Sequence, residues 1–152
     1  MENAFKKISD KLFSSLNKDE VLMLSISGEN SDFCRFNQSK VRQIGEVLDS
    51  RLSLSLINDN RICHGSITLS RDLENDLKLA EDELDRLKLE VTQLPEDPFL
   101  VMPSLSDSLS EKNHGELLSS NNVVDAITPI IKNVDLAGIW ASGNIFRGCS
   151  NS

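Results

Sequence analysis

The sequence predicts an α+β fold in which an antiparallel sheet meander packs against amphipathic helices and ends in a further strand. Three observations predict it. Apolar residues recur at three- and four-residue steps in residues 3–16 and 71–92, the period of a helix with one buried face. Between residues 21 and 69 the apolar period changes to two, which is typical of half-buried strands. The period of two returns after residue 138.

The two helices are predicted from their apolar stripes. The stripe of the first helix consists of Phe5, Ile8, Leu12, Phe13 and Leu16, and that of the second of Leu73, Leu77, Ala80, Leu84, Leu87 and Val91. We expect Ser70 to cap the second helix, because a serine side chain can accept hydrogen bonds from the first free backbone N–H groups. Pro95 ends the pattern, since proline cannot continue a helix.

Turn-forming residues divide the region of period two into strands. They lie at 28–31, 37–39 and 58–60, and a further break is expected near Asp49 and Ser50. The sequence therefore predicts four to five strands, close enough along the chain to pair as antiparallel hairpins. These strands form a sheet with one face on the core, covered by the two helices.

The second half of the chain is less regular. Residues 95–120 are rich in Ser, Pro, Asp and Glu and show neither period, which predicts an internal loop. A shorter helix comes next, capped by Asn121 or Asn122 and kinked or ended by Pro129. Residues 134–152 are interpreted as a loop and a strand. With 152 residues, the chain has the length of one ordinary domain, residues 1–152.

The composition excludes several classes of protein. A formal net charge of -8, with 24 acidic against 16 basic residues, argues against nucleic acid as a partner, because binding phosphates requires a clustered cationic face. No segment has the roughly 18 to 20 apolar residues that span a bilayer, and the first twenty residues lack the apolar core of a signal peptide. We therefore expect a cytoplasmic protein without a membrane partner.

The cysteines and histidines do not form a recognisable catalytic or metal motif. Cys63 and His64 are adjacent in a predicted strand, so their side chains point to opposite faces and cannot easily share a proton. Zinc binding by these two residues with Cys34 and Cys149 would need ligand pairs at short spacing, and none is present. A cysteine in the core beside an incidental histidine is the favoured interpretation.

Two further patterns indicate no site. The run of acids on the second helix, Glu81, Asp82, Glu83 and Asp85, is interpreted as a solvated helix face rather than a cation site. No Gly-x-Ser-x-Gly elbow of a serine hydrolase occurs. The sequence thus assigns no catalytic, cofactor-binding or metal-binding residue.

A polar cluster surrounds the predicted hairpin turn at 37–39. It consists of Arg35, Asn37, Arg42 and Gln43, whose side chains could bind a peptide backbone or a carboxylate through charge-assisted hydrogen bonds. The alternative is that these are exposed hairpin residues with local structural bonds. The cluster is our candidate contact surface for a peptide or for a neighbouring subunit.

Five stretches, in this order, resemble the N-terminal region of TldD/PmbA proteins, a family described as metallopeptidases and modulators of DNA gyrase. They are SGENSDFCRFNQSKVRQIGEV at 27–47, RLSLSLI at 51–57, SITLSRDLENDL at 66–77, LPEDPFL at 94–100 and GIWASGNIFRGCSNS at 138–152. The resemblance covers nearly the whole chain.

The resemblance implies a cytoplasmic metallopeptidase, or its metal-free partner subunit, that degrades small unfolded peptides inside a closed dimeric chamber. The family's zinc site uses a His-Glu-x-x-x-His helix and a later cysteine. Neither His64 nor His114 starts that motif. We therefore expect the chain to be the noncatalytic N-terminal part, ending before the metal-binding region and contributing chamber wall and contacts in a homo- or heterodimer. Zinc would belong to the full-length, metal-bearing members.

An alternative stays open. The chain could be an independent noncatalytic module that binds peptides or other proteins. The two interpretations differ in the DNA expected downstream of the codon for Ser152, because a continuation that encodes His-Glu-x-x-x-His would favour the peptidase fragment. Which family subunit it would resemble, and its peptide specificity, stay open as well.

We predict that this chain alone neither retains zinc nor hydrolyses peptides. A catalytic zinc needs three protein ligands in fixed geometry, and two histidines in unrelated segments do not provide them. Metal analysis after dialysis, together with an assay on an unstructured peptide, checks this. One equivalent of zinc, with cleavage that a chelator abolishes, would contradict it.

Overall fold

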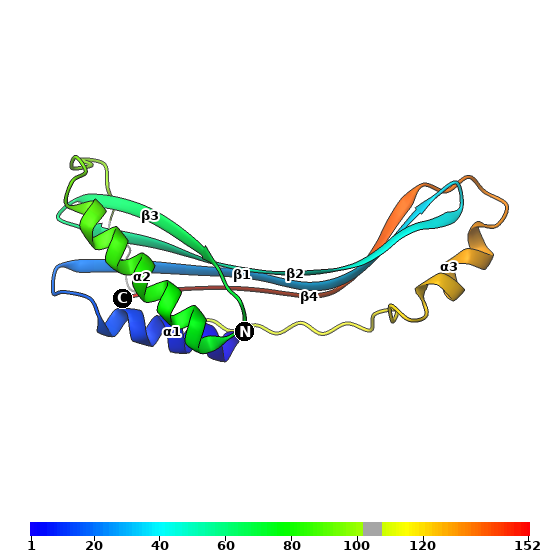
Figure 1. Ribbon diagram of the computed structural model, residues 1–152, viewed down its shortest axis with the longest axis horizontal. Helices are drawn as coiled ribbons and strands as arrows, with labels where there is room; N and C mark the ends of the chain where they lie inside the picture. The colour runs from blue at the N-terminus through cyan, green and yellow to red at the C-terminus, as the bar shows by residue number, and fades with distance from the viewer. Residues whose placement is uncertain (102–107) are drawn as a thin grey trace. The chain divides into compact units, whose positions relative to one another are not determined.

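The computed structural model describes residues 1–101 and 108–152 of the chain. Seven helices and strands lie within these residues (Figure 1). In chain order they are α1 (Glu2–Ser14), β1 (Glu20–Asn37), β2 (Lys40–Asn58), β3 (Arg61–Thr68), α2 (Leu73–Val91), α3 (Val123–Ile131) and β4 (Gly138–Asn151).

The four strands form an antiparallel sheet in the order β3-β2-β1-β4. The first three strands are a meander, and β4 returns to pair with β1 on its other side. Ser152, just beyond β4, donates its backbone N–H to the carbonyl oxygen of Leu22 near the start of β1, at 3.0 Å. The predicted fold class, a sheet meander with helices and a further strand, is confirmed.

Two tight turns set the meander. The turn between β1 and β2 is made by Gln38 and Ser39, with φ of 49° and 56°, and the turn between β2 and β3 by Asp59 and Asn60, with φ of 52° and 58°. Positive φ at both central residues is the conformation whose twist matches that of paired antiparallel strands. The turns predicted at 37–39 and 58–60 are therefore confirmed.

The other two predicted strand breaks are wrong, because neither is a turn in the structure. Residues 28–31 lie inside β1, and Asp49 and Ser50 lie inside β2, so three strands rather than four to five occupy residues 20–68. Gly28 does not have a positive φ, so its backbone stays extended and the strand continues through it, beside the end of the Met1 side chain. A small residue in a strand can mark a close approach as well as a turn.

The same two places mark a boundary of another kind. The described residues form two compact units, which we call unit 1 (residues 1–28, 49–101 and 146–152) and unit 2 (residues 29–48 and 108–145). The strands β1, β2 and β4 contribute residues to both units. The residues expected to break the strands thus lie where the chain passes from one unit to the other.

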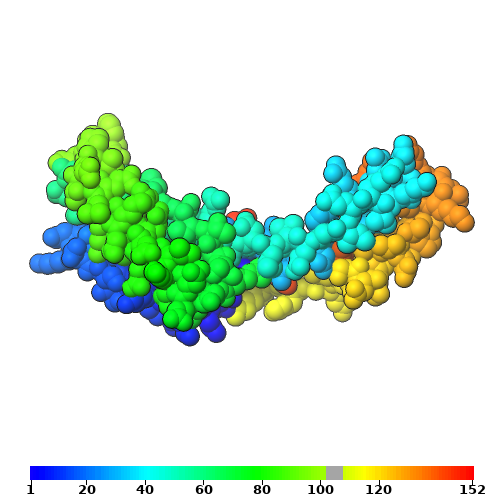
Figure 2. Space-filling view, in the orientation of Figure 1, coloured from blue at the N-terminus to red at the C-terminus, as the bar shows by residue number. Residues whose placement is uncertain are grey.

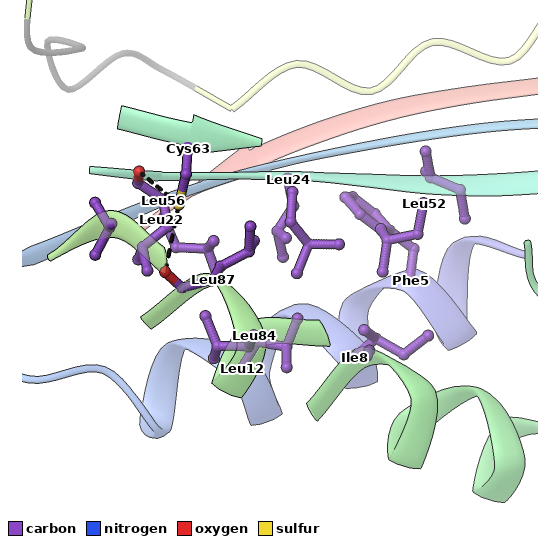
Figure 3. Close-up of a cluster of buried hydrophobic side chains, with 14 residues drawn as sticks. Phe5, Ile8, Leu12, Leu22, Leu24, Leu52, Leu56, Cys63, Leu84 and Leu87 are labelled. Atoms are coloured by element: carbon purple, nitrogen blue, oxygen red, sulfur yellow. Dashed lines mark hydrogen bonds between the residues drawn. The ribbon is translucent and has the colours of Figure 1, made fainter. Parts of the chain in front are cut away.

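Unit 1 contains the larger core. Both helices α1 and α2 cover the same face of the sheet there, and their apolar stripes meet side chains of the strands (Figures 1 and 3). The buried residues are Phe5, Ile8 and Leu12 of α1, Leu22, Leu24 and Ile26 of β1, Leu52, Leu54 and Leu56 of β2, Cys63 of β3, and Ala80, Leu84, Leu87 and Val91 of α2. The predicted helix stripes are confirmed.

The N-cap residue of α2 differs from the predicted one. Asp72, not Ser70, is the N-cap, and its carboxylate accepts hydrogen bonds from the N–H groups of Glu74 and Asn75. Ser70 instead donates both its backbone N–H, at 2.6 Å, and its hydroxyl, at 2.8 Å, to the buried carboxylate of Asp76. The loop before the helix is therefore fixed by an acid inside the helix.

Unit 2 has its own small core. Cys34 and Phe36 of β1 are buried with Val123 and Ile131 of α3, and Val124, Ile127, Leu136 and Trp140 pack against them. Pro129 lies inside helix α3, which continues to Ile131. One face of β1 in this unit is thus covered by α3.

The connection between α2 and α3 carries no helix or strand in residues 95–101 and 108–120, and the remainder of the predicted loop lies outside the described residues. Arg61, next to the turn between β2 and β3, forms hydrogen bonds to the beginning of this connection. The guanidinium donates to the carbonyl oxygen of Leu94 at 2.9 Å and to the Glu96 carboxylate at 3.0 Å. None of the described helices combines the length and apolar character that crossing a bilayer requires.

Leu84 should be a major contributor to the stability of unit 1. It is 1% exposed, so truncation to alanine leaves a cavity, and we expect Leu84→Ala to lower the free energy of unfolding by about 2 to 5 kcal/mol. Leu89, on the same helix, is 71% exposed, and Leu89→Ala should change the free energy of unfolding by about 0.5 kcal/mol or less. Urea unfolding followed by circular dichroism measures both. Equal effects would contradict the described packing of α2.

Glu20 should make stability depend on acid pH. Burial alone would raise the pKa of Glu20, but hydrogen bonds from Asn17 and the ammonium group of Lys88 outweigh it and hold the pKa below its ordinary value. The stabilisation is therefore present above the ordinary glutamate pKa of about 4.3 and is lost as the pH falls through the lower, folded-state value.

The test compares Glu20→Gln with the wild type across pH. At pH 7 the free energy of unfolding of the variant should be roughly 1 to 2 kcal/mol lower than that of the wild type. This difference should shrink below about pH 4.3. Glu116→Gln, at an exposed glutamate in the connection, is the control and should behave as wild type. A difference that is independent of pH would show that the charge of Glu20 is not the cause.

Candidate functional site

The four residues of the predicted polar cluster line one hollow in unit 2. Arg35, Asn37, Arg42 and Gln43 share this hollow, of about 640 Å³, with Phe33, Phe36, Ala137, Gly138 and Ile139. The volume lies in the range of small-ligand sites. The structure therefore brings together all the site residues that the sequence singled out, and we call this feature the hairpin hollow.

The turn between β1 and β2 explains how the polar side chains meet. Arg35 and Asn37 belong to the last residues of β1, and Arg42 and Gln43 to the first residues of β2. A two-residue turn reverses the chain between them, which places residues of both strands near one another. This local geometry is why a short sequence segment could indicate the cluster.

The segment before β4 holds this turn in place. The backbone N–H of Ser39 donates to the carbonyl oxygen of Leu136 at 3.1 Å, and the N–H of Leu136 donates back to the Ser39 hydroxyl oxygen at 3.1 Å. The Ser39 hydroxyl also donates to the carbonyl oxygen of Val134. These reciprocal bonds bring Ala137, Gly138 and Ile139 to the hollow.

The hairpin hollow is cationic. Both arginines are exposed, and no Asp or Glu of the described residues lines the hollow. Arg42 donates to the side-chain carbonyl oxygen of Gln38 at 2.9 Å, whereas Arg35 makes no ion pair or side-chain hydrogen bond with any residue that the structure describes. Cyan residues around 40–48 lie uncovered on the face shown in Figure 2. In a chain of net charge -8, this is a local concentration of positive charge.

Apolar groups form the rest of the wall. The ring of Phe33 lies so close to Gly45 that a Cβ there would stand 2.7 Å from two ring carbons. Ile139 is 66% exposed although it is a large apolar side chain. Phe36, which also lines the hollow, belongs with Cys34 and Trp140 to the core under α3. The hollow thus rests on a packed support.

Phe33 and Ile139 line the hollow but are not among the site residues predicted from the sequence. The alternation of β1 places Phe33 on the same face as Arg35 and could have indicated it. Ile139 is about one hundred residues away along the chain, and only the pairing of β4 with β1 brings it close. No local pattern carries that information.

Cys63 is not a nucleophile paired with His64. Its thiol is buried and donates to the carbonyl oxygens of Leu87, at 3.4 Å, and Leu56, at 3.8 Å (Figure 3). His64 is exposed and its Nδ1 lies 2.9 Å from the Ser55 hydroxyl oxygen. Burial, and then the negative charge of Glu90, raise the pKa of the Cys63 thiol, and burial also raises that of Cys34. Both thiols are therefore protonated at neutral pH and weakly reactive.

In the acidic run of α2, Glu81 and Glu83 form ion pairs, and Asp82 and Asp85 are exposed. Glu81 lies 3.1 Å from the Nζ of Lys11, and Glu83 lies 2.9 Å from a guanidinium nitrogen of Arg86, which also pairs with Glu90. In the described part of the chain, no group of three or more His, Cys, Asp or Glu side chains is arranged to hold a metal ion. The exposed His114 lies in the connection before α3.

Comparison with known proteins identifies solved structures of the same fold. Neither a protein-family model nor a curated protein sequence matches the chain. A proposed modulator of a DNA gyrase from Thermotoga maritima matches 97% of the chain with a TM-score of 0.66 and 14% identity. TldE from Thermococcus kodakarensis matches 97% of it with a TM-score of 0.67 and 10% identity.

A third structure extends the comparison to another organism. A proposed modulator of DNA gyrase from Bacteroides thetaiotaomicron matches 99% of the chain with a TM-score of 0.50 and 18% identity. The chain spans 35%, 37% and 38% of the lengths of these three proteins. It therefore has the fold of about one third of proteins of the TldD/PmbA type, and the resemblance in fold expected from the sequence is confirmed.

Proposed function

We propose that this chain is the N-terminal, noncatalytic part of a cytoplasmic TldD/PmbA-type metallopeptidase that degrades small unfolded peptides. The observation that supports this proposal most directly is the extent of the fold match. The match covers nearly the whole chain but only about one third of each matched structure. The order of the family-like stretches in the sequence supports the same assignment. In this proposal the zinc and the hydrolytic residues belong to the remainder of the protein.

The hairpin hollow is proposed as the contact that this part makes with a peptide or with a neighbouring subunit of a homo- or heterodimer. Two exposed arginines and two amide side chains offer hydrogen-bond donors in one place, and Arg35 has no described partner that competes for them. Such donors suit the carbonyl and carboxylate oxygens of a peptide. The role of this part is then to help form the wall of the substrate chamber.

A second candidate is an independent, noncatalytic peptide-binding or protein-interaction module. The observation that favours it is that each of the two units has its own buried core within the described residues. A unit with its own buried core can fold without a further domain.

A domain exchange separates the two candidates. Residues 1–152 would replace the structurally matched third of the Thermotoga protein. If the proposal holds, the chimera should unfold cooperatively and keep the parent's oligomeric state, as measured by light scattering. A chimera that aggregates, while the isolated chain gives a folded circular dichroism spectrum, would favour the independent module.

Arg35→Ala in the same chimera tests the role of the hollow. Loss of the Arg35 guanidinium, which has no partner among the described residues, should lower peptide turnover or subunit association by about tenfold, because a charge-assisted hydrogen bond is worth about 1.5 to 3 kcal/mol. Arg51→Ala is the matched control, since Arg51 is also an exposed strand arginine but lies in unit 1. Unchanged turnover and association, with only reduced stability, would mean that Arg35 has a local structural role.

A further inference from the structure

The hairpin hollow has two chemically different walls. Arg35, Arg42, Asn37 and Gln43 supply N–H donors, and Phe33 and Ile139 supply apolar surface. A ligand that satisfies both walls must carry hydrogen-bond acceptors at one end and an apolar group at the other.

The polar wall favours a carboxylate. Guanidinium groups donate several N–H bonds and cannot accept any, and their planar fork matches the two oxygens of a carboxylate. No described acidic side chain lines the hollow to neutralise the arginines. Arg35 in particular has no described partner to release before it binds a ligand.

The apolar wall argues against a polyanion. Ile139 leaves two thirds of its surface exposed. Covering this surface with an apolar group is favourable, whereas covering it with a second phosphate or a sugar removes water from polar groups without giving them a partner. A chain of net charge -8 also repels ligands of high negative charge at a distance. A single carboxylate beside an apolar side chain meets both conditions.

We propose that the hairpin hollow binds an apolar carboxylic acid, with its carboxylate on Arg35 and Arg42 and its apolar group against Phe33 and Ile139. The C-terminal residue of a peptide with an aliphatic side chain has this chemistry, and so does a free small acid. The inference rests on the proposed role of the hollow as a peptide contact and specifies which part of the peptide is recognised: the chain end.

The experiment uses the 152-residue chain and four probes. These are N-acetyl-leucine, N-acetyl-leucinamide, an unstructured hexapeptide that ends in leucine with a free carboxylate, and the same hexapeptide amidated. Trp140 is the only tryptophan and the chain has no tyrosine, so fluorescence reports on the core of unit 2 directly beneath the hollow strands. Isothermal titration gives an independent affinity.

The free acids should bind about tenfold or more tightly than the matched amides, because the amide loses the charge that the arginines recognise. Arg35→Ala and Arg42→Ala should each weaken binding of the free acids by a similar factor, and Arg35→Lys by less. Ile139→Ala should weaken binding of N-acetyl-leucine several-fold, whereas acetate, added as a control without an apolar group, should bind the variant and the wild type equally. Arg51→Ala, outside unit 2, should leave every affinity as in the wild type.

Each remaining outcome has a defined meaning. Tighter binding of the hexapeptide than of N-acetyl-leucine identifies a peptide end as the ligand, and equal binding identifies a free small acid. Equal affinity for acid and amide, no binding of any probe, or equal competition by phosphate would overturn the inference. Circular dichroism of the variants verifies the fold. Failure here leaves the domain exchange unaffected, so the two proposals fail separately.

Discussion

The pairing of β1 with its two neighbours is the constraint on which the rest of the structure depends. In unit 1, β1 supplies Leu22, Leu24 and Ile26 to the core beneath α1 and α2. In unit 2, it supplies Cys34 and Phe36 to the core beneath α3. Because side chains alternate along a strand, a slip of one residue would exchange buried and exposed faces throughout.

The same register creates the hairpin hollow. Cys34 and Phe36 are buried, so Arg35 and Asn37 between and after them must face the other side of the sheet. Core packing on one face therefore orients polar groups on the other. Because the strand that carries Arg35 is already fixed, binding a ligand orders the arginine side chain but not its backbone.

Much of the fold is predictable because it depends on local patterns. The stripe of α2 and the turns at Gln38 and Asp59 follow from residues a few positions apart. The failures occur where a contact outside the local pattern decides the structure. Gly28 looks like a turn residue, but its backbone is extended within β1, beside the end of the Met1 side chain. Ser70 looks like a cap, but the buried Asp76 recruits it as a donor.

The candidate site divides in the same way. Its four polar members lie within nine residues of sequence, so a single hairpin prediction could group them. The apolar wall needs Ile139, which reaches the hollow only because β4 pairs with β1. The polar cluster and Phe33 follow from one local hairpin, whereas Ile139 requires the sheet topology.

The short length of β3 has a consequence for how this protein behaves at high concentration. Pairing with β3 begins at Arg51 of β2, so within the described chain residues 40–49 have no strand on that side. An open sheet edge offers unpaired N–H and C=O groups to any other extended chain, and exposed Val41, Ile44 and Leu48 make such contacts favourable. Lys40, Arg42 and Glu46 lie among them, and burying these charges in a nonspecific strand pair is costly. The arginine that equips the hollow for a ligand thus also protects a bare edge from aggregation.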